Sequence, residues 1–397
     1  MPRGPRVNPS LIRQLNTARI FHAVRRRPGV SQRGLADATG LDKATVSTVV
    51  AALIEEGLLM RGAAVASGRR GRPERALQVD PDAGVLIGAR LEPGSIRLLA
   101  ATLAGGPLAT LEAPGHLDPD RALDALIDGV AEVVRRSGRD PSRIRAIGVG
   151  VPALFDREGA LRLAPNLRWH DVRVGSVLAE RLDAPVYVDN DTKAAGLAEL
   201  LFGPAPDVQD VLVIAGHSGI GGALYLGGRL YRGNDGFAGE LGHMKVRRGG
   251  RRCGCGARGC LEAYLSEASL LRAAHDVGLP CDHLDALVAA DVAGDRRART
   301  VLQEAGEVLG DACADLVNLL NPERIVLGGT FAVAAARMLP QIEAALDRDA
   351  LAPPRSRCEV RLSTFGADAV TMGGVALALE GFLSLPEWML AREFGSA

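Results

Sequence analysis

The sequence predicts a multidomain protein in which an N-terminal all-α winged helix–turn–helix head precedes a two-lobed α/β body. At 397 residues the chain is too long for one compact core. Residues 1–75 contain 14 Lys/Arg and 5 Asp/Glu, a net charge of +9 that the rest of the chain balances with −9. From Gly84 on, helical apolar spacing gives way to strands that alternate with amphipathic helices.

The composition excludes several classes of protein. A hydrophobic content of 47% with 24% charged residues is typical of a soluble globular protein. No segment approaches the ~20 consecutive apolar residues of a membrane span, and the N-terminus lacks the apolar core of a signal peptide. We therefore expect a cytoplasmic protein without membrane insertion, whose cysteines bind metal rather than form disulfides.

The basic first part has the pattern of a helix–turn–helix. Apolar residues at helical spacing predict a first helix, and Ser31 and Asp42 are suited to cap the two helices that follow it. The apolar residues of the first helix are Ile12, Leu15, Ile20, Phe21 and Val24. In this motif the N-terminal part of the last helix lies in the major groove. The small or polar residues predicted to face DNA there are Lys43, Ala44, Thr45, Ser47 and Thr48.

A two-stranded wing is predicted between Arg61 and Val79. Its tip carries Arg69, Arg70 and Arg72, which are placed to contact phosphates or to enter a minor groove. A solvated basic linker is the alternative. With a helix–turn–helix directly before it, DNA contact is the favoured interpretation, and double-stranded DNA is the expected partner.

The body repeats one α/β plan twice. Runs such as VLIGARL and RIRAIGVGVP form the first set, and DVLVIAGHSGIGGALYL and ERIVLGGTF belong to the second. The expected domains are the head at residues 1–80, a first lobe at 81–195 completed by a C-terminal helix at 378–397, and a second lobe at 196–377. Ligands of such sheets lie at the carboxyl ends of the strands.

Three cysteines and a histidine within one glycine-rich loop predict a structural zinc site. Cys253, Cys255 and Cys260 lie within eight residues, and His243 precedes them by ten positions. Three thiolates and one imidazole are the donor set of a tetrahedral structural zinc ion. Buried free cysteines are the alternative.

Two carboxylates flank this metal loop. Glu240 precedes His243 by three residues, and Glu262 follows Cys260 by two. A metal-bound imidazole keeps a second nitrogen for another partner, so His243 and both carboxylates could hold the hydroxyls of a sugar. That the two glutamates only support the loop, or lie at the surface, stays open.

The sequence GELGH followed by C-x-C-G-x-x-G-C-x-E resembles the signature of the ROK family, which groups repressors, open reading frames and sugar kinases. The resemblance implies an actin/hexokinase-like, ribonuclease H-like fold for the body. It also implies sugar-binding roles for Asn190 and Asp191, the latter at the position of the kinases' general base, and for Asn166. The run LDKATVSTVV with GRRGRP is similar to the winged head of ROK repressors.

The first phosphate motif departs from the family pattern. ROK kinases carry D-x-G-G-T there, whereas this chain reads ARLEPGSIR, with Glu92 and Pro93 where phosphates would lie. Phosphoryl transfer needs a positioned Mg²⁺ and a backbone cradle, so we expect no enzyme activity and a vestigial Asp191. The expected function is a transcriptional regulator, most simply a repressor, controlled by a sugar or sugar phosphate and acting as a homodimer or homotetramer. An ATP-dependent ROK-type sugar kinase with a DNA-binding head is the alternative.

Overall fold

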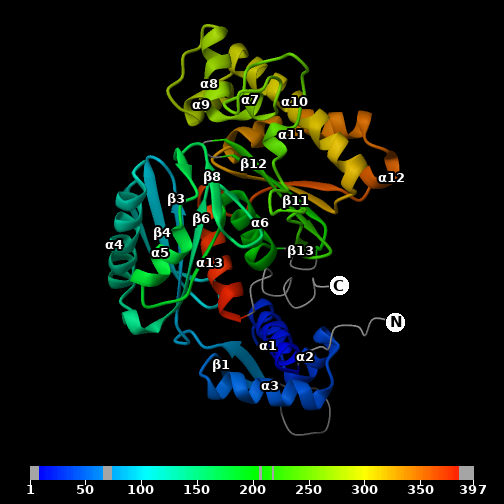
Figure 1. The fold of residues 1–397 in the computed structure, drawn as a ribbon. Coiled ribbons are helices and arrows are strands. Elements are labelled where there is room, and N and C mark those ends of the chain that lie inside the picture. The colour runs from blue at the N-terminus through cyan, green and yellow to red at the C-terminus, as the bar shows by residue number, and fades with distance from the viewer. Residues whose placement is uncertain (1–8, 66–73, 205–207, 217–218, 384–397) are drawn as a thin grey trace, which may run out of the picture. The chain divides into compact units, whose positions relative to one another are not determined.

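A computed structural model of the chain describes residues 9–65, 74–204, 208–216 and 219–383 (Figure 1). The chain divides into two compact units. The head-bearing unit comprises Met1–Val149, Arg173–Val188 and Val375–Ala397, and the metal-loop unit comprises Gly150–Val172 and Asp189–Gly374.

The head has the predicted helix–turn–helix and wing. Its helices are α1 (Pro9–Arg26), α2 (Gln32–Thr39) and α3 (Lys43–Glu55), and its antiparallel wing strands are β1 (Leu59–Val65) and β2 (Glu74–Val79). Both helix caps are confirmed, because Ser31 accepts a hydrogen bond from the Gly34 N–H and Asp42 accepts from the N–H groups of α3. Of the apolar residues that predict α1, Ile20, Phe21 and Val24 are buried, whereas Ile12 and Leu15 are 45% and 46% exposed.

The first lobe is built on a five-stranded sheet of order β10-β6-β3-β4-β5. Its strands are β3 (Val85–Leu91), β4 (Ser95–Thr102), β5 (Pro107–Pro114), β6 (Ile144–Val151) and β10 (Val186–Asn190). The connecting helices are α4 (Pro119–Ser137), the 3₁₀ turn η1 (Pro141–Arg143) and α5 (Val174–Arg181). Gly129 lets α4 approach the sheet closely, since a Cβ there would lie 2.7 Å from the Leu98 side chain.

The second sheet repeats this plan. Its order is β13-β12-β11-β14-β15, so in both sheets a three-strand antiparallel meander is followed by two further strands on the side of the meander's first strand. The strands are β11 (Val211–Gly216), β12 (Ile220–Leu226), β13 (Arg229–Leu230), β14 (Arg324–Gly329) and β15 (Glu359–Leu362). β14 is parallel to both β11 and β15. The repeat confirms the predicted two-lobed α/β body.

Helical segments lie between and after the strands of the metal-loop unit along the chain. They are α6 (Asp191–Phe202), η2 (Leu241–His243), α7 (Glu262–Leu265), α8 (Glu267–Asp276), α9 (Leu284–Val292), α10 (Arg296–Leu320), α11 (Ala332–Asp349), α12 (Ala352–Arg355) and η3 (Gly366–Asp368). A small sheet of β7 (Leu154–Phe155), β8 (Leu161–Ala164) and β9 (Trp169–His170) completes the unit. Gly306 and Gly310 bring α10 against Met338 and Ala345 of α11.

The last described helix is α13 (Ala369–Leu383). The stretch Gly366–Leu383 is long and apolar enough to match a membrane span, which the sequence was not expected to contain. Since 61% of it is buried within the fold, it has the character of a core helix.

Candidate metal centre and functional site

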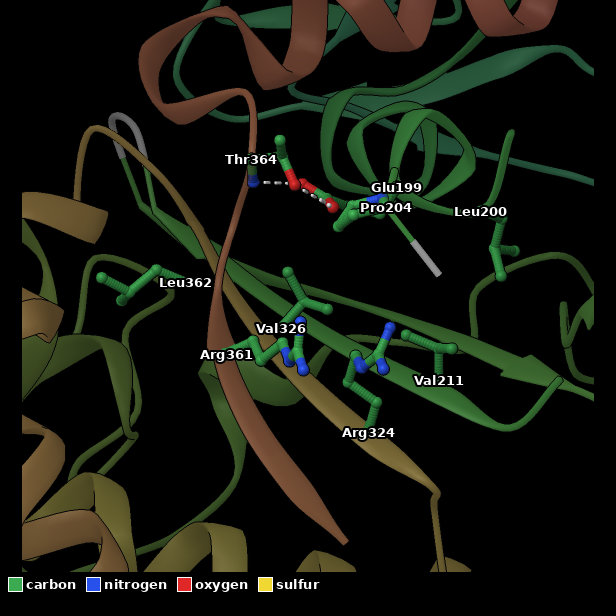
Figure 2. A pocket seen from close by; sticks show the side chains of 9 residues that line it. All are labelled: Glu199, Leu200, Pro204, Val211, Arg324, Val326, Arg361, Leu362 and Thr364. Carbon is green, nitrogen blue, oxygen red and sulfur yellow. Dashed lines mark hydrogen bonds between the residues drawn. The ribbon is translucent and has the colours of Figure 1, made fainter. Parts of the chain in front are cut away.

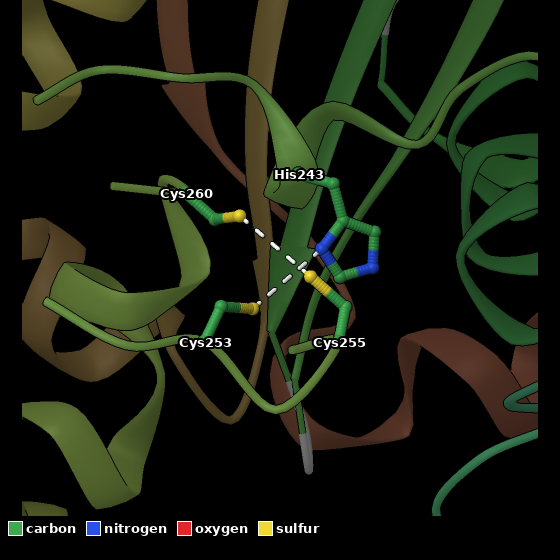
Figure 3. A group of neighbouring side chains, drawn as sticks. All are labelled: His243, Cys253, Cys255 and Cys260. Carbon is green, nitrogen blue, oxygen red and sulfur yellow. Dashed lines mark hydrogen bonds between the residues drawn. The ribbon is translucent and has the colours of Figure 1, made fainter. Parts of the chain in front are cut away.

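The four predicted metal ligands converge in space. One donor atom from each of His243, Cys253, Cys255 and Cys260 can be chosen so that all lie within 4.8 Å of one another (Figure 3). The Sγ of Cys253 is 3.8 Å from Nδ1 of His243, and the Sγ atoms of Cys255 and Cys260 are also 3.8 Å apart. Four soft or borderline donors around one point fit a tetrahedral Zn²⁺ ion.

Backbone contacts fold the metal loop. The Cys253 N–H donates to the Ala257 carbonyl over 2.9 Å, and the Gly256 N–H donates back to the Cys253 carbonyl over 3.0 Å. Gly259 adopts φ +77°, and a Cβ there would lie 1.8 Å from the Arg247 carbonyl oxygen. Only glycine allows that approach, so the glycines around the cysteines are a requirement of the loop geometry.

The thiols differ in their electrostatic surroundings. Burial raises the pKa of Cys253 to about 12, whereas a hydrogen bond from the Ala257 N–H lowers the pKa of the exposed Cys255. The Lys245 ammonium lies 2.7 Å from the Sγ of Cys260, and this hydrogen bond raises the pKa of Lys245. A cation in this position stabilises the thiolate charge that metal binding requires.

Glu262 ties the metal loop to the start of β12. Its Oε1 accepts a hydrogen bond from the Cys253 thiol at 3.3 Å, and its Oε2 accepts from the Ile220 N–H at 3.1 Å. The same end of β12 receives the segment around η2, because a Cβ on Gly242 would meet the Ile220 carbonyl oxygen at 1.9 Å. Glu240 and His243, on either side of Gly242, are therefore held beside this strand end.

His243 has one nitrogen committed to the cluster. Nδ1 faces the cysteines, and Figure 3 shows the other ring nitrogen pointing away from them. Glu240, close by, is solvent-accessible, yet desolvation by the surrounding protein raises its pKa. An imidazole N–H and an accessible carboxylate side by side can donate to and accept from neighbouring hydroxyl groups.

The predicted residues at the end of β10 begin helix α6. Asn190 is the N-cap, and its Oδ1 accepts from the N–H groups of Thr192 and Lys193, each over 3.0 Å. Its Nδ2 donates to the Ala153 carbonyl at 3.1 Å. Asp191 stands in the first turn of α6, where the helix dipole favours a negative charge.

Helix α6 and Glu262 both contact the start of β12. A Cβ on Gly221 would lie 2.2 Å from Oγ1 of Thr192, the residue after Asp191. The first residues of β12 thus bring together the start of α6, the η2 segment and Glu262. Asn166 lies on the exposed turn between β8 and β9.

Three residues that sequence reasoning did not single out hold this arrangement. The buried Asp189 accepts a two-point ion pair from Arg232, at 2.6 and 3.3 Å. The ammonium of Lys193, only 3% exposed, donates to the Gly236 carbonyl at 2.6 Å. All three could have been noticed, since Asp189 and Lys193 flank the Asn190-Asp191 pair and Arg232 precedes the loop that leads to Glu240.

In the head-bearing unit, side chains of the β3–β4 hairpin contact one another. Nε of Arg90 lies 3.5 Å from Oε2 of Glu92, and an Arg90 amino group donates to the Ser95 hydroxyl at 3.3 Å. Burial raises the pKa of Glu92. The hairpin that carries the phosphate motif in ROK kinases therefore holds a partly desolvated carboxyl group here.

The start of α3 presents most of the predicted DNA-contacting residues to solvent. Lys43, Ala44, Ser47 and Thr48 are exposed. Thr45 is half-buried and its hydroxyl donates to Asp42 at 2.6 Å, so that hydroxyl supports the helix cap. Arg69, Arg70 and Arg72 lie outside the described residues.

A separate cavity of about 210 Å³ is lined by residues of α6 and of strands β11, β14 and β15 (Figure 2). Its lining residues are Glu199, Leu200, Pro204, Val211, Arg324, Val326, Arg361, Leu362 and Thr364. Glu199 accepts a hydrogen bond from the Ser363 hydroxyl at 2.5 Å, and Arg324 and Arg361 both pair with Glu359. None of these lining residues is a candidate metal, sugar or DNA residue, so the cavity is not part of the candidate site.

Known proteins resemble both parts of the chain. Residues 13–70 match the MarR family model. The xylose repressor of Caldicellulosiruptor bescii is 29% identical, over 96% of this chain and 99% of its own length. The N-acetylglucosamine repressor of Escherichia coli O6:H1 is 29% identical, over 89% of each chain.

Solved structures agree with these relatives. A ROK family transcriptional regulator, described as a homolog of the E. coli MLC protein, has a TM-score of 0.81 at 28% identity, over 96% of this chain and 99% of its own. A ROK family glucokinase from Streptomyces griseus, in complex with glucose and AMPPNP, has a TM-score of 0.67 at 26% identity, over 75% of this chain and 100% of its own. The ROK family model itself matches residues 109–381, and the chain belongs to the ROK family.

Proposed function

We propose that this protein is a transcriptional repressor whose affinity for its operator is controlled by a sugar or sugar phosphate. The observation that carries the proposal is the combination, in one chain, of a helix–turn–helix head with a ROK body. The relatives named as repressors support it, because the similarity to the xylose repressor extends over 96% of this chain, head included.

The head would bind double-stranded operator DNA through the start of α3. Lys43, Ser47 and Thr48 are exposed there and suit contacts to phosphates and base edges. The basic tip with Arg69 and Arg70 would add phosphate contacts from the wing. A homodimer or homotetramer would place several heads on one operator.

The body would hold the effector at the start of β12. His243, Glu240 and Glu262 come from the metal loop and its flanks, and Asn190 and Asp191 come from the start of α6; Asn166 is a further candidate. The effector can shift operator binding only by its differential affinity for the DNA-binding and released states.

A structural zinc ion would fix the metal loop. Zn²⁺ with three thiolates carries a net charge of −1, which the Lys245 ammonium beside Cys260 would balance. Holding Nδ1 of His243 on the metal would fix the ring so that its other nitrogen reaches a ligand hydroxyl. Removal of the metal would therefore disturb both the loop and the sugar site.

A sugar kinase with a DNA-binding head is the second candidate function. The likeness to a glucokinase that binds glucose and AMPPNP favours it. The Arg90–Glu92 pair in the β3–β4 hairpin counts against it, because a carboxyl group there would repel the phosphates that kinases hold at this place. A coupled ADP-release assay with a hexose panel distinguishes the two, and turnover above background would favour the kinase.

The proposal is tested by operator binding in the presence of sugars. Genomic fragments that bind the purified protein are selected first, and a gel shift is then repeated with each of a panel of sugars and sugar phosphates. We expect at least one compound to change the operator Kd by about 5- to 150-fold, the usual range of allosteric coupling. If no compound changes it, the proposed regulation is wrong.

A further inference from the structure

The charge of the effector can be inferred from how the cations beside the candidate sugar residues are used. We propose that the effector is an uncharged sugar rather than a sugar phosphate, and that Lys193 is a positioning residue for its site. This inference rests on the proposed function and decides the ligand class which that function leaves open.

Three carboxylates lie at the proposed ligand site. Asp191, Glu240 and Glu262 all come from segments that meet at the start of β12. Glu240 is accessible but desolvated, and the charged groups that act on it are His243, Lys193 and Glu262. Carboxylates accept hydrogen bonds from sugar hydroxyls, whereas they repel a phosphate dianion.

Two cations beside this site, Lys193 and Arg232, are already engaged. The Lys193 ammonium is only 3% exposed and donates to the Gly236 carbonyl at 2.6 Å. Arg232 is held by both carboxylate oxygens of the buried Asp189. Moving either cation to a phosphate would leave a buried carbonyl or carboxylate without its partner, which is costly.

The segment Asp191–His243 contains one further arginine, which lies away from the start of β12. Arg229 stands on β13 opposite Leu226, at the far end of β12 from Ile220. Within Asp191–His243 the remaining described basic residue is His243 itself, whose Nδ1 faces the cysteines. The described part of this segment therefore offers hydroxyl-binding groups without an uncommitted lysine or arginine for a phosphate.

Lys193 also sets the position of the loop that ends at Glu240. Gly236 has φ +97°, and a Cβ there would lie 2.6 Å from the Phe155 carbonyl oxygen, so the chain makes a close turn at this point. The ammonium fixes the carbonyl of that turn to the first turn of α6. One end of the loop is thus tied to the helix that carries Asp191, and the other enters the metal cluster at His243.

Calorimetry on the full chain, with its zinc content verified, tests the ligand class. Glucose, mannose, xylose and N-acetylglucosamine are each compared with a phosphate monoester of the same sugar. We expect at least one neutral sugar to bind and its phosphate ester to bind at least about tenfold more weakly, since like charges in a binding site are strongly unfavourable. An ester that binds more tightly than its parent sugar would overturn the inference but leave the proposed function intact. Binding of neither kind would contradict both.

Glu240→Gln tests the origin of the selectivity, with Asp235→Asn as the control. Both changes remove one negative charge, but Asp235 is an exposed loop residue whose carboxylate accepts from the Asn234 side chain. In Glu240→Gln we expect weaker binding of the neutral sugar and a smaller ratio between the Kd values of the ester and the parent sugar. A ratio that stays at the wild-type value in Glu240→Gln would contradict the assigned repulsion.

Lys193→Met and Lys193→Arg test the positioning role. Methionine keeps most of the side-chain volume without the ammonium, and we expect the Kd for the neutral sugar to rise about tenfold, as for a lost hydrogen bond to a charged group. Zinc content and sugar-free operator binding are measured for both variants to verify that the chain still folds. Arginine retains a donor for the Gly236 carbonyl and should restore part of the affinity. Equal losses in both variants would indicate a packing role and sink the assignment.

Discussion

Single side chains of the candidate site divide their atoms between two partners. His243 directs Nδ1 to the cysteines, and Glu262 joins the Cys253 thiol to the backbone of β12 through its two oxygens. In the head, Thr45 uses its hydroxyl on Asp42 and so is a weaker candidate for base contact than its exposed neighbours Ser47 and Thr48. Spacing in the sequence identified these residues, but it could not assign each atom to its partner.

Substitution of one cysteine should remove zinc and the sugar response together. Cys255 is exposed, so Cys255→Ser changes the donor set with little effect on packing. We expect metal analysis to find the zinc lost, and the gel shift to find operator binding no longer responsive to sugar, because the loop that carries His243 loosens. Cys281→Ser, outside the cluster, is the control. Sugar binding that survives in a zinc-free variant would speak against this coupling.

Exposed residues of α3 should decide which sequence is bound. Ser47→Ala should weaken binding to the selected operator by roughly tenfold, within the 1–3 kcal/mol of a good base contact, while binding to random DNA stays unchanged. Thr300→Ala, an exposed hydroxyl on α10, is the control. Equal weakening on operator and random DNA would reassign Ser47 to phosphate contact.

At the scale of elements, several of the candidate functional residues lie at the starts of helices. Helix α3 begins at a cap formed by Asp42 and presents its first turns to solvent. Helix α6 begins at Asn190, with Asp191 in its first turn and Lys193 anchored to the Gly236 carbonyl. The unpaired N–H groups of a helix start need acceptors, so the cap residue fixes both the end of the helix and the direction of the neighbouring functional side chains.

Loss of the α3 cap should weaken operator binding through a less ordered helix start. The hydrogen bonds from Thr45 and Ala44 lower the pKa of Asp42. A lowered folded-state pKa means that the stabilisation is complete above the ordinary aspartate value of about 4 and is lost as pH falls through the folded-state pKa. Thermal unfolding of wild type and Asp42→Ala should therefore differ at pH 7 and converge on acidification.

Asp295→Ala provides the matched control for the cap. Asp295 caps α10, and its hydrogen bonds with Arg297 lower its pKa to about 2. Its loss should change thermal stability with the same sign and leave operator binding intact. If Asp42→Ala binds operator as well as wild type, the start of α3 does not depend on its cap for DNA contact.

The wing should contribute affinity without sequence preference. Arg70 lies outside the described residues and stays a prediction from the sequence. Arg70→Ala should weaken binding to all DNA and reduce the slope of log K against log salt by about one, the value for one lost phosphate contact. Arg229→Ala, exposed on β13, is the control and should leave the slope unchanged.

At the scale of the whole molecule, one sheet plan is used twice with different loops. Both sheets place an antiparallel meander beside two further strands. In the head-bearing unit the first hairpin is filled by Arg90 and Glu92, whereas in the metal-loop unit the strand after the first turn organises the candidate sugar residues.

Operator symmetry should follow from the oligomer. Helix–turn–helix dimers read half-sites about one helical turn, or a multiple of it, apart. We expect a dimer or tetramer by analytical ultracentrifugation and a pseudo-palindromic footprint. Deletion of one half-site should cost most of the specific affinity. A monomer protecting a single half-site would show that the proposed assembly is wrong.

The sequence by itself determined the helix–turn–helix head, the α/β body, the four candidate metal ligands and the departure in the first phosphate motif. These features are local, because a cap such as Asp42, the spacing of cysteines and the periodicity of apolar residues can each be recognised within a short stretch of sequence. The exposure of Ile12 and Leu15 could not be read in this way, because helical spacing alone does not say which apolar face has a partner.

Only the tertiary structure decided which polar groups remain for a ligand. Asp189 and Arg232 are 43 residues apart, as are Lys193 and Gly236, and each pair is joined in the fold. Whether a lysine binds a ligand or a backbone carbonyl depends on burial and on a partner brought from far along the chain, and neither is encoded in local pattern. The proposal that the effector is an uncharged sugar rests on that commitment of charges.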